Sequence, residues 1–241
     1  MTAHVITYAN KSSGMFESLT NNKFNVPIKV LGMGTKWNGF MDKVRGYRDY
    51  VKTLPDKDIV VIVDGFDTQV NGTLETAVSR FQKLNKSIVV SRDPVGYTEI
   101  IARKIFGTCE NGYIGNSGLM MGRAENLYNM LDDMSNESCN DDQRGLNTVC
   151  TKHDVHVDAD NVIFENTPPN DRTIKSGAVF IGFPGAMNFS RGGRALREYT
   201  QFFILEILVA FVFIALIGKR FRLPISVCMV FMALYADLSC S

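Results

Sequence analysis

The stretch VVIVDGFDTQV, residues 60–70, decides the fold. Its aliphatic residues form the pattern of a buried strand, and two acids follow directly at the end of that strand. Residues 58–64 read DIVVIVD, the continuous apolar pattern of a strand that helices cover on both faces of a parallel sheet. Asp64 ends the run, and Asp67 follows three positions later. A bare carboxylate is costly to desolvate, so we expect this pair to be solvated, hydrogen-bonded or bound to a cation.

Segments with strand and helix patterns alternate on either side of this run. Strand patterns occupy residues 3–9, 26–34, 87–91, 117–122, 161–166 and 177–183. Helical patterns occupy residues 40–54, 73–84, 97–106, 124–134 and 141–150. Such alternation predicts an α/β domain over residues 1–190, with a mostly parallel sheet flanked by helices.

Composition narrows the classes of function. The 241 residues carry a net charge of +1 and have a pI near 7.6. The chain therefore lacks the excess of positive charge that is typical of proteins that bind nucleic acid. The five cysteines match no zinc spacing, and the three in the globular part, Cys109, Cys139 and Cys150, cannot all pair. We therefore expect free thiols in a reducing compartment, with a Cys139–Cys150 disulfide as the alternative.

The end of the chain is much more apolar. Residues 202–218, FFILEILVAFVFIALIG, contain one charge, Glu206, and as a helix would reach about 26 Å, against roughly 30 Å for a bilayer core. A second apolar run covers residues 223–236. We expect a linker at residues 191–201 and a membrane-associated tail at 202–241, as one span, two spans or a half-inserted hairpin.

The two ends of the chain bear on location. The first residues, MTAHVITYANKSS, have neither the basic nor the apolar segment of a signal peptide. Basic residues lie on both sides of the first apolar run, which leaves its orientation open. We expect a membrane-associated protein whose globular domain faces the cytosol.

The two acids after the apolar strand are the first candidate site. Ligands of open parallel sheets bind at the carboxyl ends of the strands, where Asp64 and Asp67 lie. Two carboxylates this close on a turn can both face one hard cation, Mg²⁺ or Mn²⁺, which also binds the phosphates of a substrate. The alternative is that Asp64 caps the turn and Asp67 is solvated.

Two further polar segments are candidates for the same site. Asn116, Ser117 and Gly118 are expected to form a turn that lets the backbone approach a ligand, or else a plain β-turn. In NDDQ, residues 140–143, Asp141 and Asp142 either act on a sugar hydroxyl or cap the following helix, and capping is the default role.

Six blocks in the same order, over residues 5–185, resemble the N-terminal glycosyltransferase domain of procollagen lysyl hydroxylases. The blocks are VITYA; VLGMGTKWNGF with KVRGYRDYV, similar to an LGxGxxWxG stretch and its helix; VVIVDGFDTQV, similar to a strand ending in D-x-x-D; IGNSGLMMG, similar to LNSGGFIG; NDDQ, similar to a poly-aspartate DDDQ; and VDADNVIFEN, similar to LDHxxxIFQN. The apolar tail has no counterpart in that domain.

The resemblance implies a GT-A-like transferase that moves glucose or galactose from a UDP-sugar to a hydroxyl of a protein or glycan, with Mn²⁺ or Mg²⁺. It implies that Asp64 and Asp67 hold the metal and the diphosphate. The other matched positions are Phe66, to stack on uracil; Trp37, near the nucleotide or in the core; Lys43, near the donor; Asn116, Ser117 and Gly118, beside the sugar; and Asp141 and Asp142, facing the transferred sugar or the acceptor.

The chain departs from the family at a late histidine, the third metal ligand of a V-H-G-N-G type stretch. The matching VFIGFPG, residues 179–185, has Ile181 and Gly182 there, and neither His153 nor His156 aligns with the lost ligand. Either metal affinity is reduced, or a water or Asn188 fills the place. Two other functions therefore stay open: a catalytically inactive nucleotide-sugar or glycan-binding membrane protein, and a membrane scaffold that only docks partners.

Overall fold

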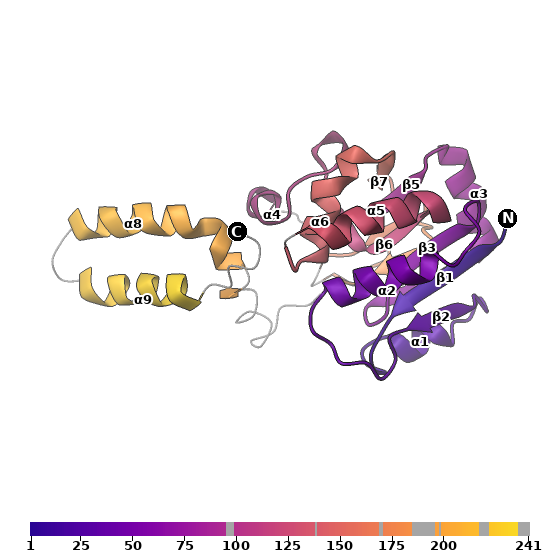
Figure 1. Ribbon diagram of the computed structural model, residues 1–241, viewed down its shortest axis with the longest axis horizontal. Coiled ribbons are helices and arrows are strands. Elements are labelled where there is room, and N and C mark those ends of the chain that lie inside the picture. Colours follow the sequence, from indigo (N-terminus) through magenta and orange to yellow (C-terminus); the bar gives the residue numbers. More distant parts are fainter. Residues whose placement is uncertain are drawn as a thin grey trace. The chain divides into compact units, whose positions relative to one another are not determined.

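The computed structural model describes residues 1–94, 99–137, 139–168, 171–184, 196–197, 199–216 and 222–235. The chain divides into two compact units, Met1–Ala186 and Met187–Ser241. In the first unit, helices pack around a central sheet (Figure 1). The second unit contains two helices of the apolar tail.

The central sheet has six strands in the order β2-β1-β3-β6-β5-β7. Strand β1 is parallel to β2 and β3, and β5 is parallel to β7, whereas β6 runs antiparallel to both β3 and β5. The predicted α/β fold with a helix-flanked sheet is confirmed, and the sheet is mixed because β6 is reversed. The bounds are β1 Ala3–Tyr8, β2 Ile28–Leu31, β3 Ile59–Asp64, β5 Ile88–Arg92, β6 Gly115–Arg123 and β7 Val155–Asp158.

Strand β6 corrects one prediction. Asn116, Ser117 and Gly118 are not a turn but belong to β6, which begins at Gly115. Asn116 pairs with Ser91 of β5 after a shift in register between Val90 and Ser91. Irregular pairing of this kind re-aims side chains near the end of a strand. The three polar residues therefore lie at a strand end beside β3.

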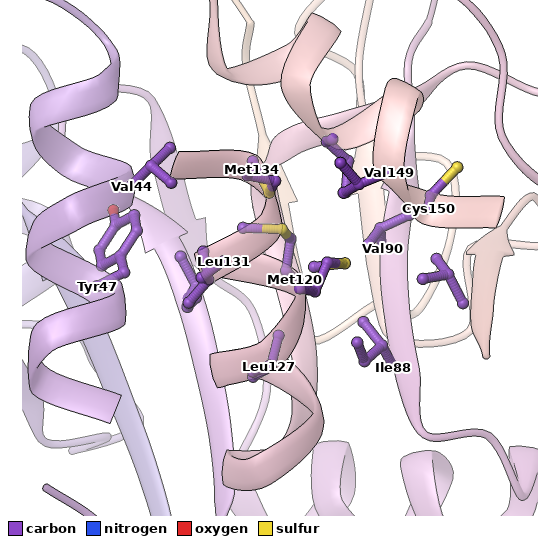
Figure 2. Packing of buried hydrophobic residues seen from close by; sticks show 14 of the residues in the cluster. Val44, Tyr47, Ile88, Val90, Met120, Leu127, Leu131, Met134, Val149 and Cys150 are labelled. Atoms are coloured by element: carbon purple, nitrogen blue, oxygen red, sulfur yellow. The ribbon is translucent and has the colours of Figure 1, made fainter. Parts of the chain in front are cut away.

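The core lies on both faces of the sheet, as the continuous apolar pattern of β3 predicts. Successive side chains of a strand point to opposite faces, so Val60 and Ile62 join one buried cluster while Val61 and Val63 join the other. The first cluster packs the sheet against helices α2 Met41–Val51, α5 Ala124–Asn136 and α6 Asp142–Val149 (Figure 2). Burial on both faces is what makes β3 aliphatic throughout.

A second, three-stranded sheet covers the other face. Its order is β4-β9-β8, formed by Thr68–Val70, Phe180–Gly182 and Phe164–Asn166. Strand β4 is antiparallel to β9, and β8 is parallel to β9. The strands add Phe164 and Phe180 to the second cluster, next to helices α1 Phe16–Thr20 and α3 Leu74–Leu84. Strand β4 has three residues and no alternation long enough to predict it.

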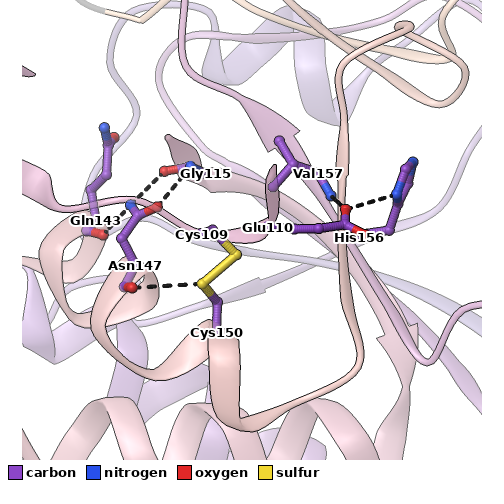
Figure 3. Close-up of a disulfide and its surroundings, with 8 residues drawn as sticks. All are labelled: Cys109, Glu110, Gly115, Gln143, Asn147, Cys150, His156 and Val157. Atoms are coloured by element: carbon purple, nitrogen blue, oxygen red, sulfur yellow. Dashed lines mark hydrogen bonds and ion pairs between the residues drawn. A yellow bond between two sulfur atoms is a disulfide. The ribbon is translucent and has the colours of Figure 1, made fainter. Parts of the chain in front are cut away.

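A disulfide joins Cys109 to Cys150 (Figure 3). It links the segment before η2 Glu110–Gly112 to η3 Cys150–Lys152, which follows α6. The prediction of free thiols is therefore wrong for these two residues, and so is the alternative pairing of Cys150 with Cys139. The two half-cystines are 41 residues apart in sequence, so only the tertiary fold brings them together.

The second unit carries the apolar tail. Its elements are η4 Thr200–Phe203, α8 Ile204–Leu216 and α9 Arg222–Tyr235. None of the helices in the described part of the chain has the length and apolar character needed to cross a membrane. The large apolar side chains of α8 and α9 that are mostly or substantially exposed are Leu205, Leu208, Val209, Val212, Ile225, Val227, Val230 and Phe231.

Candidate functional site

A small pocket lies at the carboxyl end of β3, and both Asp64 and Asp67 line it. Its empty space, open solvent included, is about 170 Å³. The other lining residues are Thr68, Asn116, Gly118, Leu119, Asn166, Gly182 and Pro184. The fold thus brings the two predicted metal ligands to the lining of one pocket.

Lys43 of α2 is buried and binds two carboxylates at once. Its Nζ lies 2.8 Å from Asp64 Oδ1 and 2.8 Å from Asp142 Oδ2. Ser117 Oγ donates a short hydrogen bond to the same Asp142 oxygen. Burial by itself lowers the pKa of Lys43, but the charges of Asp142 and Asp64 outweigh it and hold the pKa well above its usual value. The charged ammonium of Lys43 therefore links Asp64, at the end of β3, to Asp142, the first residue of α6.

Asn116 is held by a second network. Its Nδ2 donates to Asp93 Oδ2 at 3.3 Å and to Gln143 Oε1 at 3.1 Å. Gln143 Nε2 donates to the same Asp93 oxygen at 2.7 Å. Burial raises the pKa of Asp93, although the hydrogen bonds from Gln143 and Asn116 oppose the rise. The network fixes the amide of Asn116 at the edge of the pocket.

Gly118 permits the close approach between β6 and β3. A Cβ at this position would lie 2.7 Å from Asp64 Oδ2 and 2.9 Å from Asn116 Oδ1. The Gly118 N–H also donates to Asn116 Oδ1 at 2.9 Å. Any side chain here would displace the Asp64 carboxylate. The role of Gly118 is therefore to leave room for Asp64.

Trp37 and Phe66, the predicted nucleotide contacts, are partly exposed, at 39% and 36%. Trp37 packs edge-on against Phe40, with ring centroids 5.9 Å apart, and lies 6.2 Å from the ring of Tyr8. Trp37 is therefore a surface aromatic and not a core residue. Tyr8, the last residue of β1, was not predicted as part of this group. Its only signal in the sequence is an aromatic side chain at a strand's carboxyl end.

Asp141 and Asp142 have different surroundings although they are adjacent. Asp141 is the N-cap of α6 and accepts the Arg144 N–H at 2.8 Å. This is the capping role that the sequence left open for it. Asp142 is buried and faces Lys43 and Ser117. Asp142 is therefore linked to Asp64 through Lys43, whereas Asp141 Oδ1 caps α6.

The chain's histidines lie elsewhere. His4 binds Asp58 at 3.1 Å, and His153 binds Asp133 at 3.0 Å. His156 likewise binds Glu110 at 3.0 Å (Figure 3). Within the described ranges, no group of three or more histidine, cysteine or acidic residues is arranged to hold a metal ion. Asn188, considered above as a substitute ligand, lies outside the described residues.

The pocket nevertheless suits a hard cation. Thr68 follows Asp67 directly, is fully buried and lines the pocket, and its Oγ1 has no hydrogen-bond partner. A buried hydroxyl without a partner is costly, so it marks a place where a ligand or water is expected to bind. Two carboxylates and a hydroxyl are oxygen donors of the kind that Mg²⁺ and Mn²⁺ prefer. The donor set therefore fits the metal that the resemblance implies.

Comparison with known proteins agrees with the resemblance seen in the sequence. A family model described as "PLOD GT domain" matches residues 2–174. Human "Procollagen-lysine,2-oxoglutarate 5-dioxygenase 2" is 27% identical over 155 residues, which is 58% of this chain and 21% of that protein. The Caenorhabditis elegans "Multifunctional procollagen lysine hydroxylase and glycosyltransferase" is 26% identical over 183 residues, which is 67% of this chain and 25% of that protein.

Two solved structures resemble the chain more distantly. A crystal structure of the galactosyltransferase LgtC with donor and acceptor sugar analogs has a TM-score of 0.48 and 13% identity, covering 76% of this chain and 87% of that one. A197 from STIV has a TM-score of 0.41 and 8% identity, covering 65% of this chain and 81% of that one.

Proposed function

Because this chain belongs to the PLOD GT domain family, we propose that it is a glycosyltransferase that moves a hexose from a UDP-sugar to a hydroxyl acceptor. The proposed acceptor class is a hydroxyl of a protein or glycan, and one relative is named a procollagen lysine hydroxylase and glycosyltransferase. The observation that carries the proposal is that Asp64 and Asp67 line one pocket at the carboxyl end of the central strand β3. Ligands of open α/β sheets bind at this end.

Asp64, Asp67 and Thr68 would hold Mn²⁺ or Mg²⁺ in this pocket. When bound, such an ion supplies Lewis-acid stabilisation of the negative charge that develops on a leaving diphosphate. Lys43 contributes by holding Asp64 in place through a 2.8 Å contact. Trp37 and Phe66 offer exposed rings for the base of the nucleotide.

Asp142 and Asn116 act on the sugar side in this proposal. As the bond to the diphosphate breaks, the sugar gains cationic character, and carboxylates nearby stabilise it. Lys43 and Ser117 both bind the Asp142 carboxylate and hold it in place. Asp93 and Gln143 fix Asn116, so its position does not depend on the substrate.

The assay is release of UDP from UDP-glucose or UDP-galactose with Mn²⁺ and a hydroxylysine peptide as acceptor. We expect turnover in the wild type and its loss in Asp64→Asn and Asp67→Asn. Asp56→Asn is a matched control, because Asp56 is exposed and precedes the opposite end of β3. Full activity in the two pocket variants would exclude this site as the catalytic centre.

A catalytically inactive donor-binding protein is the second candidate function. The observation that favours it is that, among the described residues, no group of three or more histidine, cysteine or acidic residues is arranged to hold a metal ion. It predicts that folded wild-type protein binds UDP-sugars without releasing UDP over the full panel of donors. Turnover of any donor would exclude it.

We also propose that the tail binds a lipid membrane through α8 and α9. Large apolar side chains stay exposed on both helices, among them Leu205 at 71% and Phe231 at 68%. Basic residues flank α8 in the sequence, and such residues favour anionic headgroups. Flotation with phosphatidylserine vesicles tests this: Leu205→Asp with Phe231→Asp should abolish binding. Ile100→Asp, at an exposed isoleucine of α4 Glu99–Phe106, should leave binding unchanged.

The cytosolic placement of the globular domain stays a prediction. A disulfide such as Cys109–Cys150 is typical of oxidising compartments and weighs against it. Protease digestion of sealed membranes decides the question. Cleavage of residues 1–190 from outside would support the cytosolic side, and their protection would contradict it.

A further inference from the structure

We propose that Asn166 Oδ1 is a ligand of the pocket's divalent cation, in the role that a histidine fills in the family that the chain resembles. The inference rests on the proposed metal site at Asp64 and Asp67. Asn166 is the last residue of β8 and lines the same pocket as both acids. An amide oxygen is a donor that hard cations accept alongside carboxylates. Its presence explains how the site can be complete with only two acids.

The hydrogen bonds of Asn166 orient its side chain for this role. Nδ2 donates to Ser91 Oγ at 2.9 Å and to the Arg92 carbonyl at 3.0 Å. Because both acceptors belong to β5, they fix the nitrogen side of the amide against that strand. The oxygen then points to the other side, toward Gly182 and the pocket. Exchange of the two amide atoms would set an oxygen against the Arg92 carbonyl, which can only accept, so the hydrogen bond to Arg92 assigns the oxygen's position.

Gly182 makes room for the oxygen. A Cβ at Gly182 would lie 2.0 Å from Asn166 Oδ1, so any side chain there would collide with it. Gly182 lies in VFIGFPG, the stretch that matches the family's histidine motif. The glycine at position 182 and the position of the Asn166 amide therefore depend on each other, because the oxygen occupies the space that a side chain at Gly182 would take.

The strand register places a third donor in the same row. In the three-stranded sheet, Gly182 pairs with Thr68 on one side and with Asn166 on the other. Residues paired across neighbouring strands project to the same face of a sheet. Thr68 and Asn166 therefore flank the gap left by the glycine, and Thr68 Oγ1 is buried without a partner. With Asp64, Asp67 and Asn116, the pocket lining has five side chains that carry oxygen.

Manganese binding without substrate provides a test that does not depend on activity. The fraction of free Mn²⁺ is measured by electron paramagnetic resonance for the full chain and three variants. Asn166→Leu removes the oxygen at similar volume and is expected to weaken Mn²⁺ binding about tenfold or more. Asn166→Ala removes the same oxygen without filling its space and is expected to weaken Mn²⁺ binding by a similar factor. Asn71→Ala, which loses a similar Nδ2 bond to Ala178 but lines no part of the pocket, should bind unchanged.

The outcomes separate this inference from the proposed function. If the wild type binds Mn²⁺ and a folded Asn166→Leu binds equally well, Asn166 is not a ligand and the metal site stands without it. If Asn166→Leu does not fold, the alanine variant decides, because unchanged Mn²⁺ binding by folded Asn166→Ala would overturn the inference. If the wild type itself binds no Mn²⁺, both the metal-dependent function and this inference are wrong.

Discussion

Replacing Lys43 with methionine removes the ammonium that binds both Asp64 and Asp142. Each contact is 2.8 Å long, and the side chains of Lys43 and Asp142 are each only 9% exposed. Removing one partner from a buried ion pair costs about 3–5 kcal/mol, because the other charge is left buried without compensation. Asp64 is 32% exposed and partly solvated, so we expect about 3 kcal/mol, the lower end of that range.

The assay is urea unfolding at neutral pH together with a thermal melt. A loss of about 3 kcal/mol corresponds to a Tm lower by roughly 6–12 °C for a domain of this size. The folded pKa of Lys43 is raised, so its contribution is fully present below the unfolded pKa and is lost only as the pH rises through the folded value. The deficit of Lys43→Met should therefore be fully present at neutral pH and shrink at strongly alkaline pH.

Lys86→Met is the matched control. Lys86 pairs with Asp154 at 3.1 Å, but their side chains are 35% and 51% exposed. Exposed pairs contribute about 0–1 kcal/mol, so this variant should unfold close to the wild type. The reasoning is refuted if Lys43→Met and Lys86→Met lose equal stability at neutral pH.

Three further changes have expected outcomes. Gly118→Ala places a Cβ 2.7 Å from Asp64 Oδ2, so Mn²⁺ affinity measured by calorimetry should fall while the fold persists. Burial raises the pKa of Asp93, so its charged form destabilises the fold above the unfolded pKa. Asp93→Asn should thus raise the free energy of unfolding at pH 7, with a smaller gain toward acid pH. Cys109→Ala removes the disulfide to Cys150, which closes a loop of 41 residues. In the chain-entropy model this loss lowers the free energy of unfolding by about 4 kcal/mol. Unfolding of the wild type with and without a reductant, compared with the variant, measures the difference.

Local patterns predicted most of the central layer. The aliphatic run at Ile59–Val63 identifies β3, because burial on both faces of a sheet excludes polar side chains. The helical spacing from residue 40 identifies α2, observed at Met41–Val51. Strand β4 and the reversed direction of β6 were not predicted, because a three-residue strand and a strand's direction leave no periodic signal.

The candidate site was predicted only in part. Asp64 and Asp67 are close in sequence and follow a recognisable strand, so their shared pocket follows from local order. Thr68 and Asn166 are 98 residues apart and meet through Gly182, which a sequence pattern does not reveal. The link from Lys43 to Asp142 likewise joins two helices that are distant along the chain.

The order of residues alone determined that a buried strand ends on two acids, that helices flank a sheet, and that the tail is apolar. These features depend on the period of apolar side chains and on the cost of burying charge, both of which are local properties. Only the tertiary structure decided which oxygens line the pocket with those acids, because strand register sets which side chains become neighbours. It also decided that Cys150 pairs with Cys109, since pairing depends on distance in space and not on spacing along the chain.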